Sequence, residues 1–237
     1  MCVHASIEAL AWESEFFHRR CARLNFSADA PVIDASQLAA FDVVQAKIAA
    51  NQVALADALA DLNFRLVEGE VDLAVSIGTE NAEISAPERQ NVRLAGEGDI
   101  SWLKQQAAQA FALSRFRAPW YQNGDSGRFY ALWAEKAVLG TFDHRCLIVG
   151  DEQGAPQGFV TLRDLDGDDV RIGLLAVAPG AAGRGVGGQL MGAATAWCRQ
   201  HDKRTLRVAT QTGNVGALRL YIRSGAQITS TAYWLYR

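Results

Sequence analysis

The chain has 237 residues, a formal net charge of −3 and 49% hydrophobic residues. This length allows one large domain or two small ones, and the weak negative charge excludes a broad basic surface for nucleic acid. We expect neither a signal peptide nor a membrane span. The four cysteines and four histidines lack metal-ligand spacing, so we expect a cytoplasmic protein without a bound metal.

The N-terminal third contains one expected helix and one expected strand. Residues 43–62 look helical, and residues 65–75 have the alternation of a β-strand. The strand's period of two places a row of carboxylates on one face: Glu68, Glu70 and Asp72. Such a row is either a solvated surface or the wall of a site, where repulsion between like charges raises the pKa of at least one carboxyl.

A polar, non-periodic segment at residues 79–91 predicts a linker. We therefore expect an N-terminal accessory domain over residues 1–78 and a second domain over residues 92–237. The second domain has the predicted order β-α-α-β-β-β-α-β-α-β. Its expected strands are 92–95, 146–149, 159–165, 170–177, 205–210 and 228–236, and its expected helices are 99–112, 126–139, 187–201 and one that begins at Asn214. The fold class is α/β with a mixed sheet.

Arginine and aromatic residues are concentrated between the first two helices of this domain, in S-R-F-R-A-P-W-Y at residues 114–121. The guanidinium groups of Arg115 and Arg117 suit a diphosphate, and aromatic faces such as Tyr121 suit a base or a sugar. A packed loop with arginines at its rim is an equally good interpretation.

A glycine-rich loop follows the strand that ends at Val177. Its glycines leave room for a ligand, and the next helix directs free N–H groups and its positive dipole end toward the loop. This arrangement suits a pyrophosphate. A dinucleotide fingerprint fits residues 183–188, but the expected acidic ribose ligand is missing, and no Gly-Lys pair supports a P-loop. A glycine-rich surface turn is the remaining alternative.

Two motifs together resemble the GNAT superfamily of N-acyltransferases. A-G-R-G-V-G at residues 182–187 is similar to [QR]-x-x-G-x-[GA], with Ala182 replacing Gln or Arg. N-V-G-A-L-R-L-Y-I-R-S-G-A at residues 214–226 is similar to N-x-x-A-x-x-x-Y-x-x-x-G-F, with Ala226 replacing Phe. In this motif Asn214 is a good N-cap, and Ala217 and Tyr221 share one helix face.

The resemblance implies an acyltransferase that uses acetyl-CoA as its co-substrate. It implies that acetyl-CoA is held by Leu175, Ala176, Val177, Gly183, Arg184, Gly185, Val186, Gly187, Gly188, Asn214 and Ala217. Backbone N–H groups at residues 176 and 177 would polarise the thioester. Tyr221, with an ordinary pKa of about 10, would protonate the leaving thiolate. Glu68 is our candidate for the base, and we favour direct transfer over an acyl-enzyme.

Four further segments resemble GNAT enzymes that acetylate an amino-sugar nucleotide: residues 66–73, 111–121, 141–144 and 230–237. This resemblance implies N-acetylation of the 4-amino group of dTDP-4-amino-4,6-dideoxy-D-galactose (dTDP-fucosamine) in enterobacterial common antigen biosynthesis. Arg115, Arg117 and Tyr121 would bind this substrate. Alternatives are another small amine or a peptide as acceptor, or a non-catalytic acyl-CoA-binding module. C-terminal strands of such folds often pair between subunits, which gives the hypothesis of a homodimer.

The accessory domain carries a faint copy of the second motif. Asn51 and Ala54 repeat the spacing of Asn214 and Ala217, with Ala58 in the place of the tyrosine. Residues 63–64 then resemble residues 225–226, one position out of register. We interpret residues 1–78 as a degenerate half of the same fold that cannot hold coenzyme A, because no glycine-rich loop precedes the copy. Chance similarity between two helix–turn–strand units is the alternative.

Overall fold

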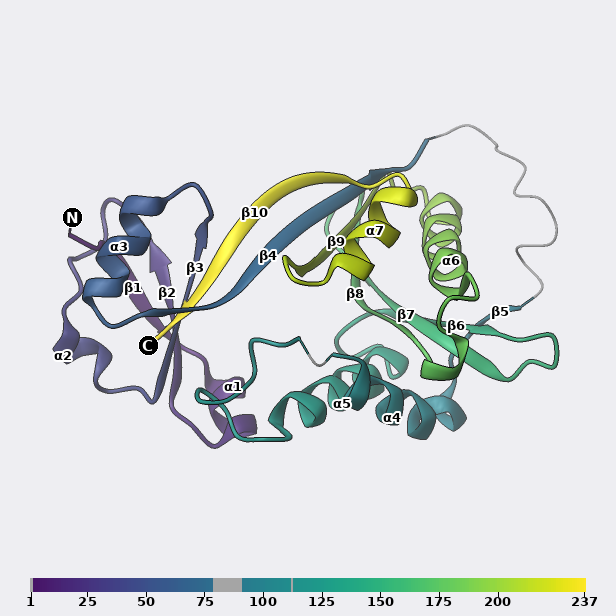
Figure 1. Ribbon diagram of the computed structural model, residues 1–237, viewed down its shortest axis with the longest axis horizontal. Helices are drawn as coiled ribbons and strands as arrows, with labels where there is room; N and C mark the ends of the chain where they lie inside the picture. Colours follow the sequence, from purple (N-terminus) through teal and green to yellow (C-terminus); the bar gives the residue numbers. More distant parts are fainter. Residues whose placement is uncertain (1, 79–90, 112) are drawn as a thin grey trace.

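One ten-stranded mixed sheet runs through the computed structural model, which describes residues 2–78, 91–111 and 113–237 (Figure 1). The strand order is β1-β2-β3-β10-β4-β9-β8-β7-β6-β5. The strands are β1 (Ala5–Ala9), β2 (Cys21–Phe26), β3 (Val43–Ala49), β4 (Arg65–Ser76), β5 (Val92–Leu94), β6 (Arg145–Gly150), β7 (Pro156–Asp164), β8 (Asp169–Val177), β9 (Thr205–Gln211) and β10 (Gln227–Tyr236). The α-helices are α1 (Ala11–Phe17), α2 (Ala35–Leu38), α3 (Val53–Asp61), α4 (Ile100–Ala110), α5 (Asp125–Val138), α6 (Val186–Gln200) and α7 (Val215–Arg223). Short 3-10 helices in the described residues are η2 (Glu97–Asp99) and η3 (Pro179–Ala181).

The mixed α/β sheet and the order of elements after residue 91 are confirmed. The expected helix at residues 43–62 is wrong in its first part, because Val43–Ala49 forms β3 and only Val53–Asp61 is helical. β3 lies between β2 and β10, with residues 43–46 buried and Lys47 and Ala49 exposed. A strand of seven residues with mixed apolar and polar side chains, followed closely by an alanine-rich helix, is not distinguished from that helix by periodicity alone.

Helices cover both faces of the C-terminal part of the sheet. α6 and α7 pack on one face and α4 and α5 on the other, and each pair closes its own hydrophobic cluster (Figure 1). The cluster beneath α6 includes Leu190, and the cluster beneath α4 includes Leu103; both side chains are fully buried. No helix in the described ranges is long and apolar enough to cross a membrane.

The N-terminal strands repeat the C-terminal ones in register. β2 and β3 pair in parallel from Cys21 and Val43, as β8 and β9 do from Asp169 and Thr205. β10 lies between β3 and β4, and β4 lies between β10 and β9, so each half places its last strand in the sheet of the other (Figure 1). These registers support the interpretation of residues 1–78 as a degenerate half of the fold.

The repeat also corrects the expected alignment by one residue. α3 and α7 have the same length, and Gln52 and Asn214 stand at their N-caps. The C-terminal caps correspond as well, with positive φ at Asn63 and Gly225. Leu59, and not Ala58, therefore occupies the place of Tyr221.

The N-terminal half lacks the elements that would hold a cofactor. Between β2 and β3 it has only the four-residue α2, where the C-terminal half has the glycine-rich loop and the fifteen-residue α6. Most of the expected linker, residues 79–90, lies outside the described residues. The division into domains at 1–78 and 92–237 stays a prediction.

Candidate active site

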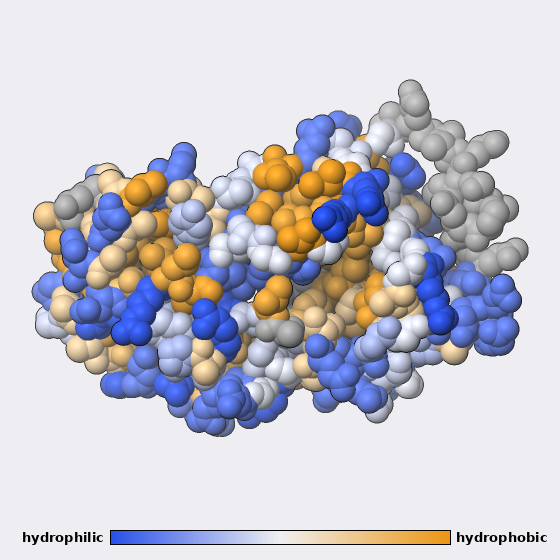
Figure 2. Space-filling model, in the orientation of Figure 1, coloured by the Kyte–Doolittle hydropathy of each residue, from blue (hydrophilic) through white to orange (hydrophobic). Residues whose placement is uncertain are grey.

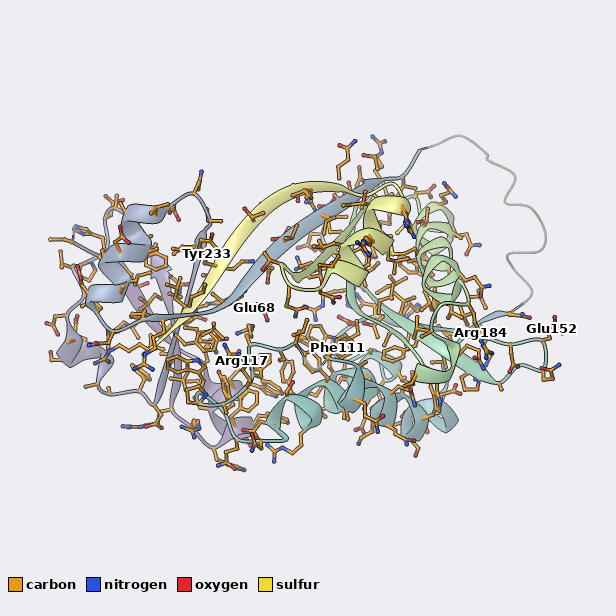
Figure 3. The ribbon with its side chains drawn as sticks, viewed as in Figure 1. Glu68, Phe111, Arg117, Glu152, Arg184 and Tyr233 are labelled. Carbon is orange, nitrogen blue, oxygen red and sulfur yellow. The ribbon has the colours of Figure 1, made fainter. Side chains whose placement is uncertain are left out.

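A cavity of about 550 Å³ lies at the centre of the molecule. Its walls come from β3, β4, β7, β8, β9, β10, α5, α7 and the end of α4. Figure 3 shows Glu68 of β4 and Phe111, just after α4, on opposite sides of this space. On the face drawn in Figure 2, hydrophobic residues gather over α7, where Val215 and Ile222 are exposed.

The cavity opens where β8 and β9 diverge. The two strands pair over only three residues, Asp169–Arg171 with Thr205–Arg207. Beyond this point one edge of β8 is unpaired. The Ala178 N–H donates to the Gln157 carbonyl on the β7 side. Because backbone groups alternate in direction along a strand, the Leu175 and Val177 N–H groups face the open edge and the Ala176 N–H faces β7.

The glycine-rich loop begins beyond η3 and leads into α6. Gly183 and Gly185 have φ of 76° and 81°, a conformation that glycine adopts without strain. Gly185 is the N-cap of α6, and no side chain caps the helix there. The first-turn N–H groups are therefore open to an anion. Residues 183–188 do not line the cavity; Figure 3 shows Arg184 far from Glu68.

Tyr221 lies on α7, one helical turn beyond Ala217, and both residues line the cavity. The Asn214 side chain accepts a hydrogen bond from the Ala217 N–H at 3.2 Å, which caps the helix. Tyr221 is only 5% exposed, and burial raises the pKa of its phenol to about 12. The phenol therefore keeps its proton at neutral pH and is able to donate it.

The three carboxylates share one strand face as expected, but their surroundings differ. Glu70 accepts hydrogen bonds from Lys47 Nζ at 2.5 Å and Trp234 Nε1 at 2.9 Å. Burial raises the pKa of Glu70, but these two bonds outweigh it and hold the pKa below its ordinary value. Asp72 lies 3.5 Å from Arg171 and does not line the cavity.

Glu68 is the carboxylate whose acidity is weakened. Burial raises its pKa to about 7, the nearby charge of Arg115 opposes this, and the charge of Glu70 adds to it. The expected raised pKa is therefore present, but burial is its largest cause and repulsion between like charges is a smaller one. A carboxyl with a pKa near the working pH is suited to general base catalysis.

Of the expected acceptor residues, only Arg115 lines the cavity. Its guanidinium lies over the ring of Trp234 at 4.0 Å and donates to Gln45 Oε1 at 3.0 Å and to the Tyr236 hydroxyl. In the part of the chain that the structure describes, no carboxylate lies within 4.0 Å of this guanidinium.

Arg117 and Tyr121, which we expected to bind the acceptor, lie outside the cavity lining, and their role stays a prediction. Arg117 is exposed, and its Nη2 donates to the Val67 carbonyl at 3.1 Å. Tyr121 is 2% exposed and packs against Phe17, with its hydroxyl accepting from Gln45 at 3.0 Å. A loop sequence of alternating Arg and aromatic residues does not show which side chains turn into the core.

Sequence reasoning missed several groups that line the cavity. Lys47 comes from the strand that was expected to be a helix, and Trp234 comes from β10. Trp133 and Asp143 lie on and after α5, in segments where the sequence shows no spacing motif. A signal was present for Asp143 and for Trp234, since residues 141–144 and 230–237 carry part of the resemblance. Within the described residues, no group of three or more His, Cys, Asp or Glu is placed to hold a metal ion.

Comparisons with known proteins agree with this geometry. The acetyltransferase (GNAT) family model matches residues 107–226. A dTDP-fucosamine acetyltransferase from Escherichia coli O6:H1 is 50% identical over 237 residues, which is 100% of both chains. A functionally unknown conserved protein from Staphylococcus epidermidis ATCC 12228 has a TM-score of 0.65 at 13% identity, covering 100% of this chain and 92% of the other. A tandem GNAT protein from the clavulanic acid biosynthesis pathway has a TM-score of 0.60 at 13% identity, covering 92% and 74%.

Proposed function

Since the chain belongs to the acetyltransferase (GNAT) family and is an N-acetyltransferase, we propose that its acceptor is dTDP-4-amino-4,6-dideoxy-D-galactose (dTDP-fucosamine), acetylated at the 4-amino group. The observation that carries this proposal is 50% identity along the full length to a dTDP-fucosamine acetyltransferase. By the same resemblance, we include the enterobacterial common antigen pathway in the proposal, together with a cytoplasmic location. The homodimer stays a hypothesis without the strand pairing that suggested it, because β10 pairs with β3 and β4 of its own chain.

The cavity and the α6 N-terminus outside its lining would together hold acetyl-CoA. The open N-terminus of α6, with Gly183 and Gly185, suits the pyrophosphate. The free N–H groups of Leu175 and Val177 lie along the unpaired edge of β8, where they would donate to the thioester oxygen as negative charge develops on it. Asn214 and Ala217 line the same cavity and would flank the pantetheine arm.

The chemical step needs a base and an acid, and the cavity lining includes a candidate for each. Glu68 would take a proton from the substrate ammonium, so that the free amine attacks the thioester carbon. As the new C–N bond forms and the C–S bond breaks, Tyr221 would give its proton to the departing sulfur. Together these steps give direct transfer in a ternary complex.

The cysteines support direct transfer over an acyl-enzyme. None of the four cysteines is in the cavity lining; Cys2 is exposed, and Cys21, Cys146 and Cys198 are fully buried. Burial raises the thiol pKa of Cys21 to about 11 and those of the other two to about 12. Such thiols carry almost no thiolate at neutral pH, and the thiolate is the nucleophilic form.

The acceptor's diphosphate suits the end of the cavity near β3 and β10. Arg115 lacks a carboxylate partner there, and Lys47, which is paired with Glu70, stands on the same wall at 5.5 Å from the Trp234 ring. A guanidinium without a carboxylate partner gains strong charge-assisted bonds when it meets a diphosphate. Tyr121 would act indirectly, because Gln45 joins it to Arg115, and Arg117 would contact only the outer part of the nucleotide. The N-terminal half thereby supplies part of the acceptor wall through Lys47.

A thiol-release assay with acetyl-CoA tests the proposal against a panel of acceptors. The panel holds dTDP-fucosamine, its 4-epimer, a UDP-linked 4-amino sugar, small free amines and peptides, with Tyr221→Phe as the control enzyme. We expect the highest kcat/KM with dTDP-fucosamine. Preference for a free amine or a peptide would contradict the substrate, and binding of acetyl-CoA without turnover of any acceptor would indicate a non-catalytic module.

A further inference from the structure

Asp143 is a carboxylate with no exposed surface, on which three donors converge. Trp133 Nε1 and Thr161 Oγ1 each donate to its Oδ2 at 2.6 Å, and Arg163 Nε donates to its Oδ1 at 2.9 Å. A buried charge is costly unless it is paired and hydrogen-bonded, and a satisfied buried network holds its members rigidly. Asp143 therefore fixes the direction of the Trp133 indole.

Gly173 provides the space for this carboxylate. A Cβ at Gly173 would clash with Asp143 Oδ2 and would lie 2.9 Å from Thr161 Oγ1. Gly173 lies in β8 where its register with β7 shifts, only two residues before Leu175. Two residues along a strand span about 7 Å. Trp133 therefore stands close to the open edge of β8, where the thioester would react.

The Trp133 indole forms part of an aromatic wall of the cavity. It stacks on Tyr130 at 6.2 Å and meets Phe129 edge-on at 5.7 Å, and all three rings line the cavity. Phe129 in turn contacts Phe116, over which the Arg115 guanidinium lies at 4.3 Å. Two phenylalanine rings thus separate Trp133 from the cation assigned to the diphosphate. A sugar ring attached to that diphosphate would lie along this wall.

The Trp133 indole itself offers no free polar group. Arg163 Nη2 is buried without a partner, but Arg163 bonds the other carboxylate oxygen of Asp143, Oδ1. The indole has a single donor, Nε1–H, and Asp143 accepts it. A C6 methyl group on the sugar would pack against the indole without losing a hydrogen bond. A C6 hydroxyl buried there would lack a partner, and an unsatisfied buried hydroxyl is unfavourable.

From this arrangement we infer that Trp133, aimed by Asp143, is the surface on which the acceptor's sugar ring lies, and that it selects a 6-deoxy sugar over a 6-hydroxy sugar. Trp133 is then a specificity-determining residue and Asp143 a positioning residue. The inference rests on the proposed function and deepens it, because it assigns the sugar-recognition part of the same site.

Binding measurements separate the sugar from the nucleotide. Calorimetry compares dTDP-fucosamine with dTDP alone, for the wild type, Trp133→Phe, Trp133→Ala and the control Trp197→Phe, which lies on α6 outside the cavity. We expect Trp133→Ala to weaken dTDP-fucosamine binding about tenfold, in line with the worth of an aromatic contact, and to leave dTDP binding unchanged. An equal loss for dTDP, or no loss for the sugar nucleotide, would overturn the inference.

Selectivity provides a second readout that a merely structural role would not move. The ratio of kcat/KM between dTDP-fucosamine and its 6-hydroxy analogue should be about ten to a hundred in the wild type. Trp133→Phe frees Asp143 Oδ2 to accept a C6 hydroxyl, so this ratio should fall about tenfold. Asp143→Asn should raise the acceptor KM without changing the acetyl-CoA KM.

Equal kcat/KM values of the wild type for dTDP-fucosamine and its 6-hydroxy analogue would refute the inference. This test does not depend on the folding of any variant. Failure of the proposed function has a different signature. In that case the wild type would bind no dTDP-linked amino sugar while it acetylates another amine.

Discussion

Replacing Glu68 by glutamine removes a carboxyl whose pKa burial raises from 4.5 to about 7. Because the folded-state pKa is the higher one, the folded protein binds more protons than the unfolded chain between these two pH values. The contribution of Glu68 to the free energy of unfolding is therefore fully present below pH 4.5 and is lost as the pH rises through about 7. The loss is about 3 kcal/mol, at about 1.4 kcal/mol for each pH unit between the two values. The Glu68→Gln variant should not show this pH-dependent loss of unfolding free energy.

The same ionisation sets the expected rate profile. Glu68 accepts a proton only when it is ionised, so the wild-type kcat/KM should rise through about pH 7. In Glu68→Gln, kcat/KM should no longer rise through about pH 7. Part of the rate should return only at higher pH, where solvent deprotonates the substrate amine.

Urea unfolding at about pH 5 and pH 8 measures the first effect, and thiol release over the same range measures the second. Asp72→Asn is the matched control, because Asp72 lies on the same strand face but outside the cavity lining. Parallel stability profiles for the wild type and Glu68→Gln, together with identical pH–rate profiles, would refute the reasoning.

Three further changes test other parts of the account. Tyr221→Phe should lower kcat about a hundredfold or more and leave acetyl-CoA binding unchanged; a wild-type kcat in steady-state assays would remove the phenol from the mechanism. Gly185→Val should raise the KM for acetyl-CoA sharply, because a β-branched residue is strained at a φ of 81°; unaltered calorimetric binding would mean that the loop is only a turn. Gly173→Ala should lower the free energy of unfolding by about 1–3 kcal/mol through the clash with Asp143, and an unchanged urea midpoint would contradict the described packing.

The glycine-rich loop and the helix of Tyr221 could be predicted from the sequence because both are local. The loop needs positive φ at Gly183 and Gly185, and the helix needs a cap and a fixed spacing from Asn214 to Tyr221. A few consecutive residues are enough to show each of these requirements. The alternation of β4 likewise placed Glu68 on the correct face.

Features that depend on distant segments could not be predicted in this way. Lys47 reaches the cavity only because β10 inserts beside β3, a pairing of residues far apart in the sequence. The contact of Trp133 with Asp143 depends on the space left by Gly173 in another strand. The Tyr121 side chain lies in the core because its ring packs on Phe17 of α1.

The position of the new bond is the most direct test of the central claim. The wild-type enzyme is incubated with dTDP-fucosamine and acetyl-CoA labelled with carbon-13 at the carbonyl. Proton–carbon correlation NMR then locates the label in the product, and intact-protein mass spectrometry tests whether the enzyme carries it. The account predicts that the labelled carbonyl correlates with the amide proton at C4 of the sugar and that the protein stays unlabelled. A label on a sugar hydroxyl or on the protein would contradict direct transfer to the 4-amino group.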